Sequence, residues 1–175
     1  MDGIWPHACG VKGEKKTVSG ENILVCDDDK AIVDFCVEAL AAQGYHVCGV
    51  SSGEEAIAVA GKERFDLLVV DLVMSGINGF EIFKAIREFD SEIVGMIITG
   101  YGNLTASIEA MKSGFKEFIM KPFTYDELVS GVAEALKKSK SERDSVAYKQ
   151  AEKLKEDFLT MISHELQTPL AMVQI

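Results

Sequence analysis

The stretch Phe65-Asp66-Leu67-Leu68-Val69-Val70-Asp71-Leu72-Val73-Met74 decides how this chain folds. Its four consecutive apolar residues, 67–70, are typical of a strand that is buried on both faces of a parallel sheet. The run ends in one carboxylate, Asp71, and Gly76 and Gly79 follow it, as in a loop. Open α/β sheets bind ligands at the carboxyl ends of their strands, so Asp71 is a candidate site residue. Taken alone, it is equally well interpreted as the cap of the next helix.

Outward from this strand, apolar runs alternate with segments of helical periodicity. The apolar runs predict five strands, at 22–26, 45–50, 66–70, 93–99 and 117–120. The intervening segments predict helices at 30–42, from 51 to Gly61, at 80–89, at 103–112 and from 124 onward. This alternation predicts an α/β fold with a flavodoxin-like, five-stranded parallel sheet in the order 2-1-3-4-5 and helices on both faces.

The last predicted helix starts clearly and has no clear end. Thr124 and Glu127 have the spacing of a capping box, which marks its first turn. There is no Gly or Pro between Leu136 and Gln167, so we expect a long C-terminal helix. Apolar residues at three- to four-residue spacing form a seam suited to a partner helix: Ala147, Ala151, Leu154, Phe158 and Ile162.

Composition and charge narrow the possible classes of protein. The net charge is −10, and residues 21–136 carry twenty Asp and Glu against eight Lys and Arg, or −12. Such an acidic body disfavours nucleic acid as a partner and is compatible with a cation site. The four cysteines form no zinc motif and indicate reduced thiols and a cytoplasmic location. No stretch reaches the roughly 18 apolar residues of a membrane span.

Polar residues follow the predicted strands at their carboxyl ends. They are Asp27, Asp28, Asp71, Thr99 and Lys121. In the predicted strand order the first and third strands are neighbours, so the three carboxylates converge and favour Mg²⁺, which prefers hard oxygen ligands. With the lysine ammonium and the threonine hydroxyl, this set suits transfer of a phosphoryl group to an aspartate. A helix cap, an ordinary strand threonine and a surface lysine are the alternatives for the single residues.

Four segments carry a resemblance to a known family: Ile23 to Asp29, Val70 to Gly79, Ile98 to Gly102 and Met120 to Phe123. With them, residues 22–138 resemble the receiver domain of two-component response regulators. The resemblance implies that Asp71 is the phosphoacceptor and that Asp27, Asp28 and the backbone carbonyl of Val73 help to hold Mg²⁺. It also implies that Thr99 and Lys121 contact the phosphoryl oxygens.

The same resemblance makes three further statements about single positions. The Lys121-Pro122 bond is expected to be cis. Phe118 occupies the position of the switch aromatic, which is often Tyr, although plain core packing is an equal alternative. Ser75 stands where the family usually has Pro, a departure that we expect to loosen the loop without touching the chemistry.

Near the C-terminus, the segment Ser163-His164-Glu165-Leu166-Gln167-Thr168-Pro169-Leu170 is similar to the phosphoacceptor H-box of sensor histidine kinases. The resemblance implies that His164 is a second phosphoacceptor, with Glu165 beside it as a base or orienting partner. The residues alone favour a surface histidine on an amphipathic helix. Gln167 replaces the usual Arg, and the 175 residues include no Gly-rich ATP-binding domain, so we expect no ATP binding in the family's manner.

The predicted organisation is a disordered tail at 1–20, a receiver at 21–138, a helical linker at 139–157 and a truncated phosphoacceptor helix at 158–175. The predicted function is phosphorelay signalling, with a histidine kinase or phosphotransfer protein as partner and a homodimer through the C-terminal helix. A receiver-like scaffold, a fragment of a DNA-binding regulator and a Mg²⁺-dependent phosphatase are the alternatives. No DNA-binding module follows the receiver, and Val73 stands where such a phosphatase needs an acid.

Overall fold

The structure, a computed structural model, describes residues 20–100 and 113–167, without the side chains of 157, 158 and 161–167. The predicted disordered tail, apart from Gly20, and the predicted helix at 103–112 lie outside the described residues. The chain divides into two units, Met1–Lys137 and Lys138–Ile175. The first unit contains the sheet and the candidate site.

The first unit is built on a five-stranded sheet in the order β2-β1-β3-β4-β5, as the sequence predicts. Every neighbouring pair is parallel. The strands are β1 (Asn22–Cys26), β2 (His46–Val50), β3 (Leu67–Asp71), β4 (Val94–Thr99) and β5 (Phe115–Met120). All residues of β3 are buried, which explains why residues 67–70 are continuously apolar and do not alternate with polar residues.

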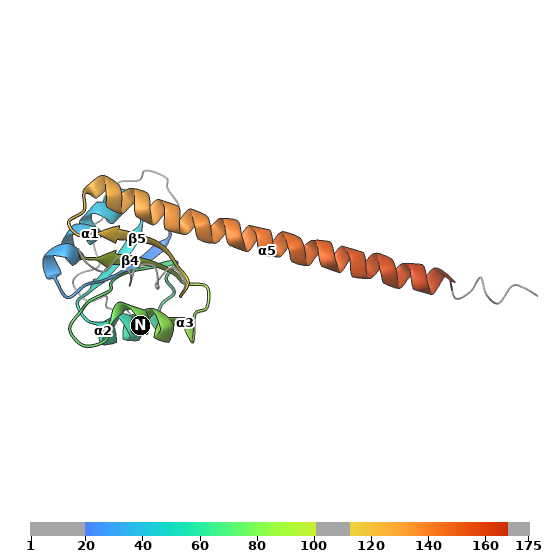
Figure 1. Cartoon of the computed structure of the whole chain (residues 1–175), viewed down its shortest axis with the longest axis horizontal. Helices are drawn as coiled ribbons and strands as arrows, with labels where there is room; N and C mark the ends of the chain where they lie inside the picture. Colours follow the sequence, from blue (N-terminus) through green and yellow to red (C-terminus); the bar gives the residue numbers. More distant parts are fainter. Residues whose placement is uncertain (1–19, 101–112, 168–175) are drawn as a thin grey trace, which may run out of the picture. The chain divides into compact units, whose positions relative to one another are not determined.

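Helices cover both faces of this sheet (Figure 1). The described helices are α1 (Lys30–Ala42), α2 (Gly53–Ala60), α3 (Gly79–Arg87) and α5 (Tyr125–Gln167). Successive strand residues point to opposite faces. Accordingly, Leu24 and Leu68 belong to one core cluster with residues of α2 and α3. Their neighbours Ile23 and Leu67 belong to a second cluster with α1 and the first turns of α5.

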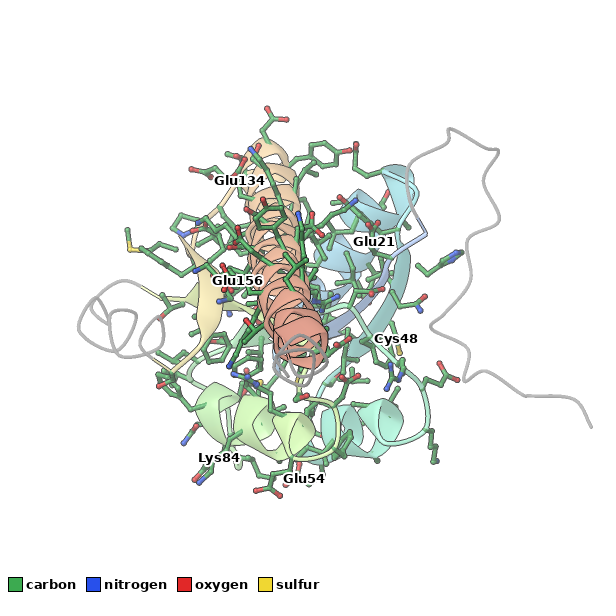
Figure 2. The ribbon with its side chains drawn as sticks, turned by 90° about the vertical axis from the view of Figure 1, so that its right-hand side faces the viewer. Glu21, Cys48, Glu54, Lys84, Glu134 and Glu156 are labelled. Carbon is green, nitrogen blue, oxygen red and sulfur yellow. The ribbon has the colours of Figure 1, made fainter. Side chains whose placement is uncertain are left out.

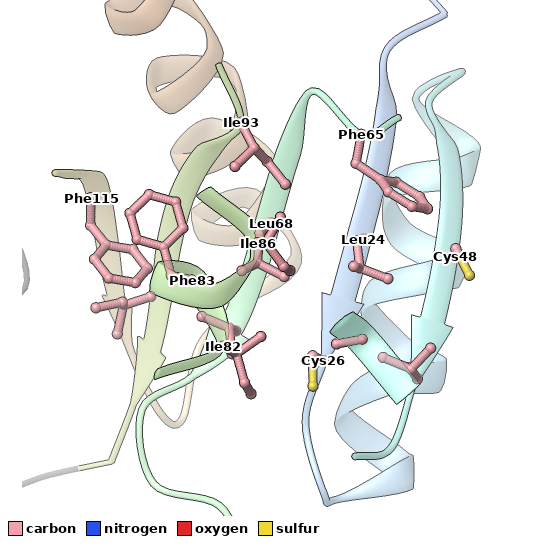
Figure 3. Packing of buried hydrophobic residues seen from close by; sticks show 14 of the residues in the cluster. Leu24, Cys26, Cys48, Phe65, Leu68, Ile82, Phe83, Ile86, Ile93 and Phe115 are labelled. Carbon is pink, nitrogen blue, oxygen red and sulfur yellow. The ribbon is translucent and has the colours of Figure 1, made fainter. Parts of the chain in front are cut away.

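Aromatic packing closes the core between α3 and the edge strand β5. The rings of Phe83 and Phe115 lie 4.2 Å apart between centroids, beside Ile82 and Ile86 of α3 (Figure 3). The prediction that β5 begins at residue 117 is wrong, because the buried Phe115 already pairs with Gly95. A Cβ on Gly95 would lie 2.5 Å from the Phe115 ring, so this pairing requires glycine. A register shift between Gly95 and Met96 then moves β4 relative to β5.

Side-chain caps fix the starts of the helices. The predicted capping box of α5 is confirmed, since the Glu127 N–H donates to Thr124 Oγ1 and the Thr124 N–H donates to Glu127 Oε2. Asn78 and Glu81 form a second capping box at α3, which the sequence analysis did not identify. Both pairs satisfy backbone donors that a helix start leaves free.

The two ends of α5 differ in exposure. Leu128, Val132 and Ala135 are completely buried, whereas Leu154 is 70% exposed and Leu159 is 54% exposed. Glu134 and Glu156, like Glu54 of α2 and Lys84 of α3, are exposed (Figure 2). Among the described residues, no helix combines the length and apolar character needed to cross a membrane.

Candidate functional site at the carboxyl edge of the sheet

Three carboxylates meet where β1 and β3 end. The two strands pair in parallel, with Cys26 opposite Val70, so the residues after Cys26 lie beside Asp71. One oxygen from each of Asp27, Asp28 and Asp71 lies within 4.8 Å of the others. Asp27 is completely buried and Asp71 is 6% exposed, whereas Asp28 is exposed. The strand order therefore brings together the three acids that the sequence analysis selected.

One ammonium group lies against two of these carboxylates. Lys121 follows β5, and its Nζ lies 2.7 Å from Asp27 Oδ2 and 2.6 Å from Asp71 Oδ2. The Lys121-Pro122 peptide bond is cis, as the resemblance implies. Because three acids face one lysine, the cluster keeps an excess of negative charge that favours a cation.

Thr99 is the last residue of β4 and is 1% exposed. Its carbonyl oxygen accepts a hydrogen bond of 2.7 Å from the Lys121 N–H, which ties the end of β4 to the residue that carries the ammonium. Its Oγ1 is buried and has no hydrogen-bond partner among the described residues. Buried hydroxyls normally have partners, so this oxygen is a candidate contact for a ligand.

Backbone N–H groups hold the carboxylates of Asp27 and Asp71 in place, and other residues cap the helices that follow. The Asp29 N–H donates to Asp27 Oδ1 at 2.8 Å, and the Val73 N–H donates to Asp71 Oδ1 at 2.9 Å. The N-cap of α1 is Asp29, and that of α3 is Asn78. The alternative interpretation of Asp71 as the cap of the next helix is therefore wrong.

Gly79 is needed for close packing at this edge. A Cβ at Gly79 would lie 2.5 Å from the carbonyl oxygen of Asp71. A side chain there would push the start of α3 away from the end of β3. The sequence analysis treated this glycine only as part of a loop.

Ser75 contacts the acidic cluster. Its N–H and its Oγ donate to Asp28 Oδ2 at 3.0 and 3.2 Å. Ser75 thus contacts a candidate metal ligand, which the sequence did not lead us to expect. Whether it leaves the chemistry untouched stays a prediction. The sequence signal was the residue type itself, since serine supplies two donors where proline has none.

The pKa values of the cluster reflect these contacts. Burial raises the pKa of Asp27, an effect that the hydrogen bond from Lys121 only partly offsets. The Ser75 N–H lowers the pKa of Asp28. Burial alone would lower the pKa of Lys121, but its bonds to Asp27 and Asp71 together raise it. This raised pKa keeps the Lys121 ammonium charged at neutral pH.

The donor set fits a magnesium ion. Carboxylate oxygens are hard ligands, and Mg²⁺ takes a few of them while it keeps several waters. Asp27, Asp28 and Asp71 supply such oxygens within one small volume, and their excess negative charge matches a divalent cation. Val73, whose carbonyl is the fourth predicted ligand, lies in the loop after β3 with its side chain 62% exposed.

Three other predicted site residues lie elsewhere. Phe118 is half-buried in β5 and packs against the core cluster of the α2 and α3 face, a placement compatible with both of its interpretations. His164 and Glu165 belong to α5 in the second unit, and their side chains lie outside the described residues.

Comparisons with known proteins match the first unit. The model of the family "Response regulator receiver domain" matches residues 23–133. The chain is 34% identical over 121 residues to the transcriptional regulatory protein ZraR of Klebsiella oxytoca, covering 68% of this chain and 27% of ZraR. It is 32% identical over 125 residues to the transcriptional regulatory protein YvrH of Bacillus subtilis, covering 71% of this chain and 52% of YvrH.

A solved structure gives the same result for the fold. The crystal structure of a response regulator receiver domain protein from Clostridium thermocellum has a TM-score of 0.64 and 29% identity, covering 69% of this chain and 97% of that one. The family match spans more than half of the chain and contains every residue of the acidic edge. The chain therefore belongs to the family of response regulator receiver domains, the phosphorelay modules of two-component signalling.

Proposed function

We propose that Asp71 accepts a phosphoryl group, in a Mg²⁺-dependent reaction, from a phosphohistidine of a histidine kinase or phosphotransfer protein. The observation that carries the proposal is the position of Lys121 Nζ, 2.6 Å from Asp71 Oδ2, beside an acid cluster within 4.8 Å. This arrangement gives the Asp71 carboxylate a cationic neighbour, Lys121, and places it in a candidate cation site. It is the arrangement that phosphoryl transfer by positioning and charge neutralisation requires.

In the proposed reaction, an oxygen of Asp71 forms a bond to phosphorus as the bond from phosphorus to the donor's imidazole nitrogen breaks. The Val73 N–H holds Oδ1 of Asp71, which orients the carboxylate for attack. Lys121 and the Thr99 hydroxyl bind the oxygens of the transferred group. Asp27, Asp28, Asp71 and the Val73 carbonyl would hold a magnesium ion, which would supply charge neutralisation for the transferred group.

The same residues give the receiver a route to two states. In our proposal, the Thr99 hydroxyl turns toward the phosphoryl group, and the half-buried Phe118 follows into the space that this movement opens. Phe118 carries no hydroxyl, so its inward position would rest on packing alone. The Oγ1 of Thr99, which has no hydrogen-bond partner within residues 20–100 and 113–167, supports this assignment.

Acetyl phosphate, a small acyl-phosphate donor, tests the phosphoacceptor. With Mg²⁺, intact-mass measurement should find one phosphoryl group on the wild type and none on Asp71→Asn. Asp34→Asn, which removes an exposed acid of α1, is the matched control and should label like the wild type. Equal labelling of the wild type and Asp71→Asn would rule out Asp71 as the acceptor.

We extend the proposal to the second unit: His164 is a second phosphoacceptor, Glu165 orients it, and the seam of α5 pairs with a second copy of the chain. The H-box-like sequence supports the first two roles. The exposed Leu154 of this seam supports a partner helix, since burying such a side chain contributes about 1.5–3 kcal/mol. The described cysteines, Cys26, Cys36 and Cys48, are buried, and the cytoplasmic location remains part of the proposal.

The phosphorylated forms of Asp71 and His164 can be distinguished by their stability in alkali. Alkali cleaves an acyl phosphate on Asp71 but leaves a phosphohistidine intact. Alkali-stable label that is present in the wild type and absent from His164→Gln would support relay between the two residues. Label that is entirely alkali-labile would contradict it.

Regulation of transcription is the second candidate, because ZraR and YvrH are named transcriptional regulatory proteins. The chain spans 27% of the first and 52% of the second, so their names describe proteins much longer than the matched receiver. Binding of the purified chain to DNA, with a steep dependence on salt, would favour this candidate.

A further inference from the structure

We propose that Ser75 is a positioning residue that holds Asp28 for the metal ion and thereby strengthens divalent cation binding. The inference rests on the proposed Mg²⁺ site and adds a residue that takes no part in coordinating the ion. Its basis is a pair of hydrogen bonds between residues that lie 47 positions apart in the chain.

Both bonds end on the same oxygen. The Ser75 N–H donates to Asp28 Oδ2 at 3.0 Å and the Ser75 Oγ donates to it at 3.2 Å, so neither bond uses Oδ1. Two donors on one oxygen fix the plane of an exposed carboxylate, which otherwise rotates freely in water. The carboxylate held in this way is the one that lies within 4.8 Å of the oxygens of Asp27 and Asp71.

The bonds also join the two loops that carry the candidate ligands. Asp28 lies in the loop after β1, and Ser75 lies in the loop after β3, two residues beyond Val73. Asp27 and Asp71 are each held by a donor from their own loop, Asp29 and Val73. The Ser75–Asp28 pair instead crosses directly from one loop to the other. It adds to the Lys121 ammonium, which also contacts both halves of the site through Asp27 and Asp71.

Such a link lowers the cost of binding an ion. A site whose ligands are already placed loses less conformational freedom when the ion arrives, and outer partners of metal ligands commonly change affinity by 10–100-fold. Proline at this position would have neither an N–H nor a hydroxyl, so both bonds would be lost. Because Asp28 is exposed and water replaces part of the loss, we expect Ser75→Pro to weaken binding by about ten-fold, the lower end of that range.

The test is a titration with Mn²⁺, followed by the electron paramagnetic resonance signal of the free ion, with Mg²⁺ added as competitor. Ser75→Ala keeps the N–H and should weaken Mn²⁺ and Mg²⁺ binding by about three-fold, as expected for one lost hydrogen bond. Ser75→Thr keeps both donors and should bind as the wild type does. Ser91→Ala, an exposed serine before β4, is the matched control, and Asp28→Asn marks the loss of a ligand.

The positioning role is supported if the affinity for Mn²⁺ and Mg²⁺ falls in the order Ser75→Thr, Ser75→Ala, Ser75→Pro. Equal affinities in the four proteins with serine, threonine, alanine or proline at this position would overturn it, as would tighter binding by Ser75→Pro. Thermal unfolding without metal identifies a variant that has merely lost its fold, and Ser75→Ala then decides. No phosphoryl donor is present, so the result is independent of whether Asp71 is phosphorylated.

Discussion

The two parts of α5 have the same secondary structure for different reasons. Up to Lys137 the helix buries Leu128, Val132 and Ala135 completely in the core of the first unit. Beyond it, the large apolar side chains that the structure describes are exposed, with Leu154 at 70%. The family match ends at residue 133, close to this change. Burial therefore specifies the first part, whereas helix propensity and the absence of Gly and Pro specify the second.

This difference in burial between the two parts of α5 decides which functional residues the packing of the protein holds in place. In the first unit, buried contacts place each polar group, so the positions of Asp27, Asp71 and Lys121 follow from the packing of the sheet. In the second unit, the exposed Leu154 is the observation behind the proposed partner helix.

Truncating a leucine to alanine should change the free energy of unfolding strongly in the inner part of α5 and very little in the outer part. Leu128→Ala should lower the free energy of unfolding by about 2–5 kcal/mol, because it leaves a cavity beneath the sheet. Leu154→Ala should change it by less than about 0.5 kcal/mol, because the side chain is mostly in water and both residues favour helix. Urea unfolding followed by circular dichroism at low protein concentration measures both. Equal losses would show that the outer part is packed as firmly as the inner part.

Pairing of the outer seam should respond to the state of the receiver. Beryllofluoride with Mg²⁺ mimics the phosphoryl group, and we expect it to change the dimerisation free energy by about 1–3 kcal/mol, the usual size of an allosteric coupling. Sedimentation equilibrium of the wild type, with and without beryllofluoride, measures the change. Leu154→Glu should abolish the dimer, whereas Glu152→Gln on the same helix should not. A monomer in every condition at tens of micromolar would contradict the proposed seam.

The sheet could be predicted from the sequence because each strand is marked by a local run of apolar residues, and several such runs agree on one fold. The run 67–70 is typical of a buried strand. The parallel order of the strands then brings Asp27, Asp28 and Asp71 to one edge of the sheet. The Thr124–Glu127 capping box was equally readable, since both partners lie within one turn. The start of β5 was missed because it depends on Gly95 accepting the ring of Phe115, a contact between distant segments.

The bond between Ser75 and Asp28 shows the limit most clearly. It joins two loops that lie far apart in the sequence, and its formation depends on backbone conformations that no local pattern specifies. From the sequence, Ser75 was only a departure from the family pattern. Its effect on the site could be inferred only after the structure placed its donors against the carboxylate.

Metal binding should stabilise the first unit and leave the second unaffected. With Mg²⁺ at ten times its dissociation constant, the free energy of unfolding should rise by about 1.4 kcal/mol. Asp28→Asn, tested at the same Mg²⁺ concentration, should show a much smaller rise because a ligand is lost. Glu156→Gln, which removes an exposed carboxylate of the outer helix, should respond as the wild type does. An equal response of Asp28→Asn would place the ion elsewhere.

The smallest effect concerns the buried carboxylate itself. Burial raises the pKa of Asp27 above its ordinary value of 3.8, so the folded protein holds this proton more tightly than the unfolded chain does. The associated stability is fully present below pH 3.8 and is lost as the pH rises through the raised pKa. Without metal, Asp27→Asn should therefore be more stable than the wild type at pH 7, and the difference should shrink as the pH falls toward 4.

Asp28 behaves in the opposite sense, because its lowered pKa gives stability that is lost as the pH falls below 3.8. Urea unfolding in EDTA across this range measures the profile, and an Asp27→Asn variant that is less stable at pH 7 would mean that its ion pair with Lys121 outweighs the cost of burial.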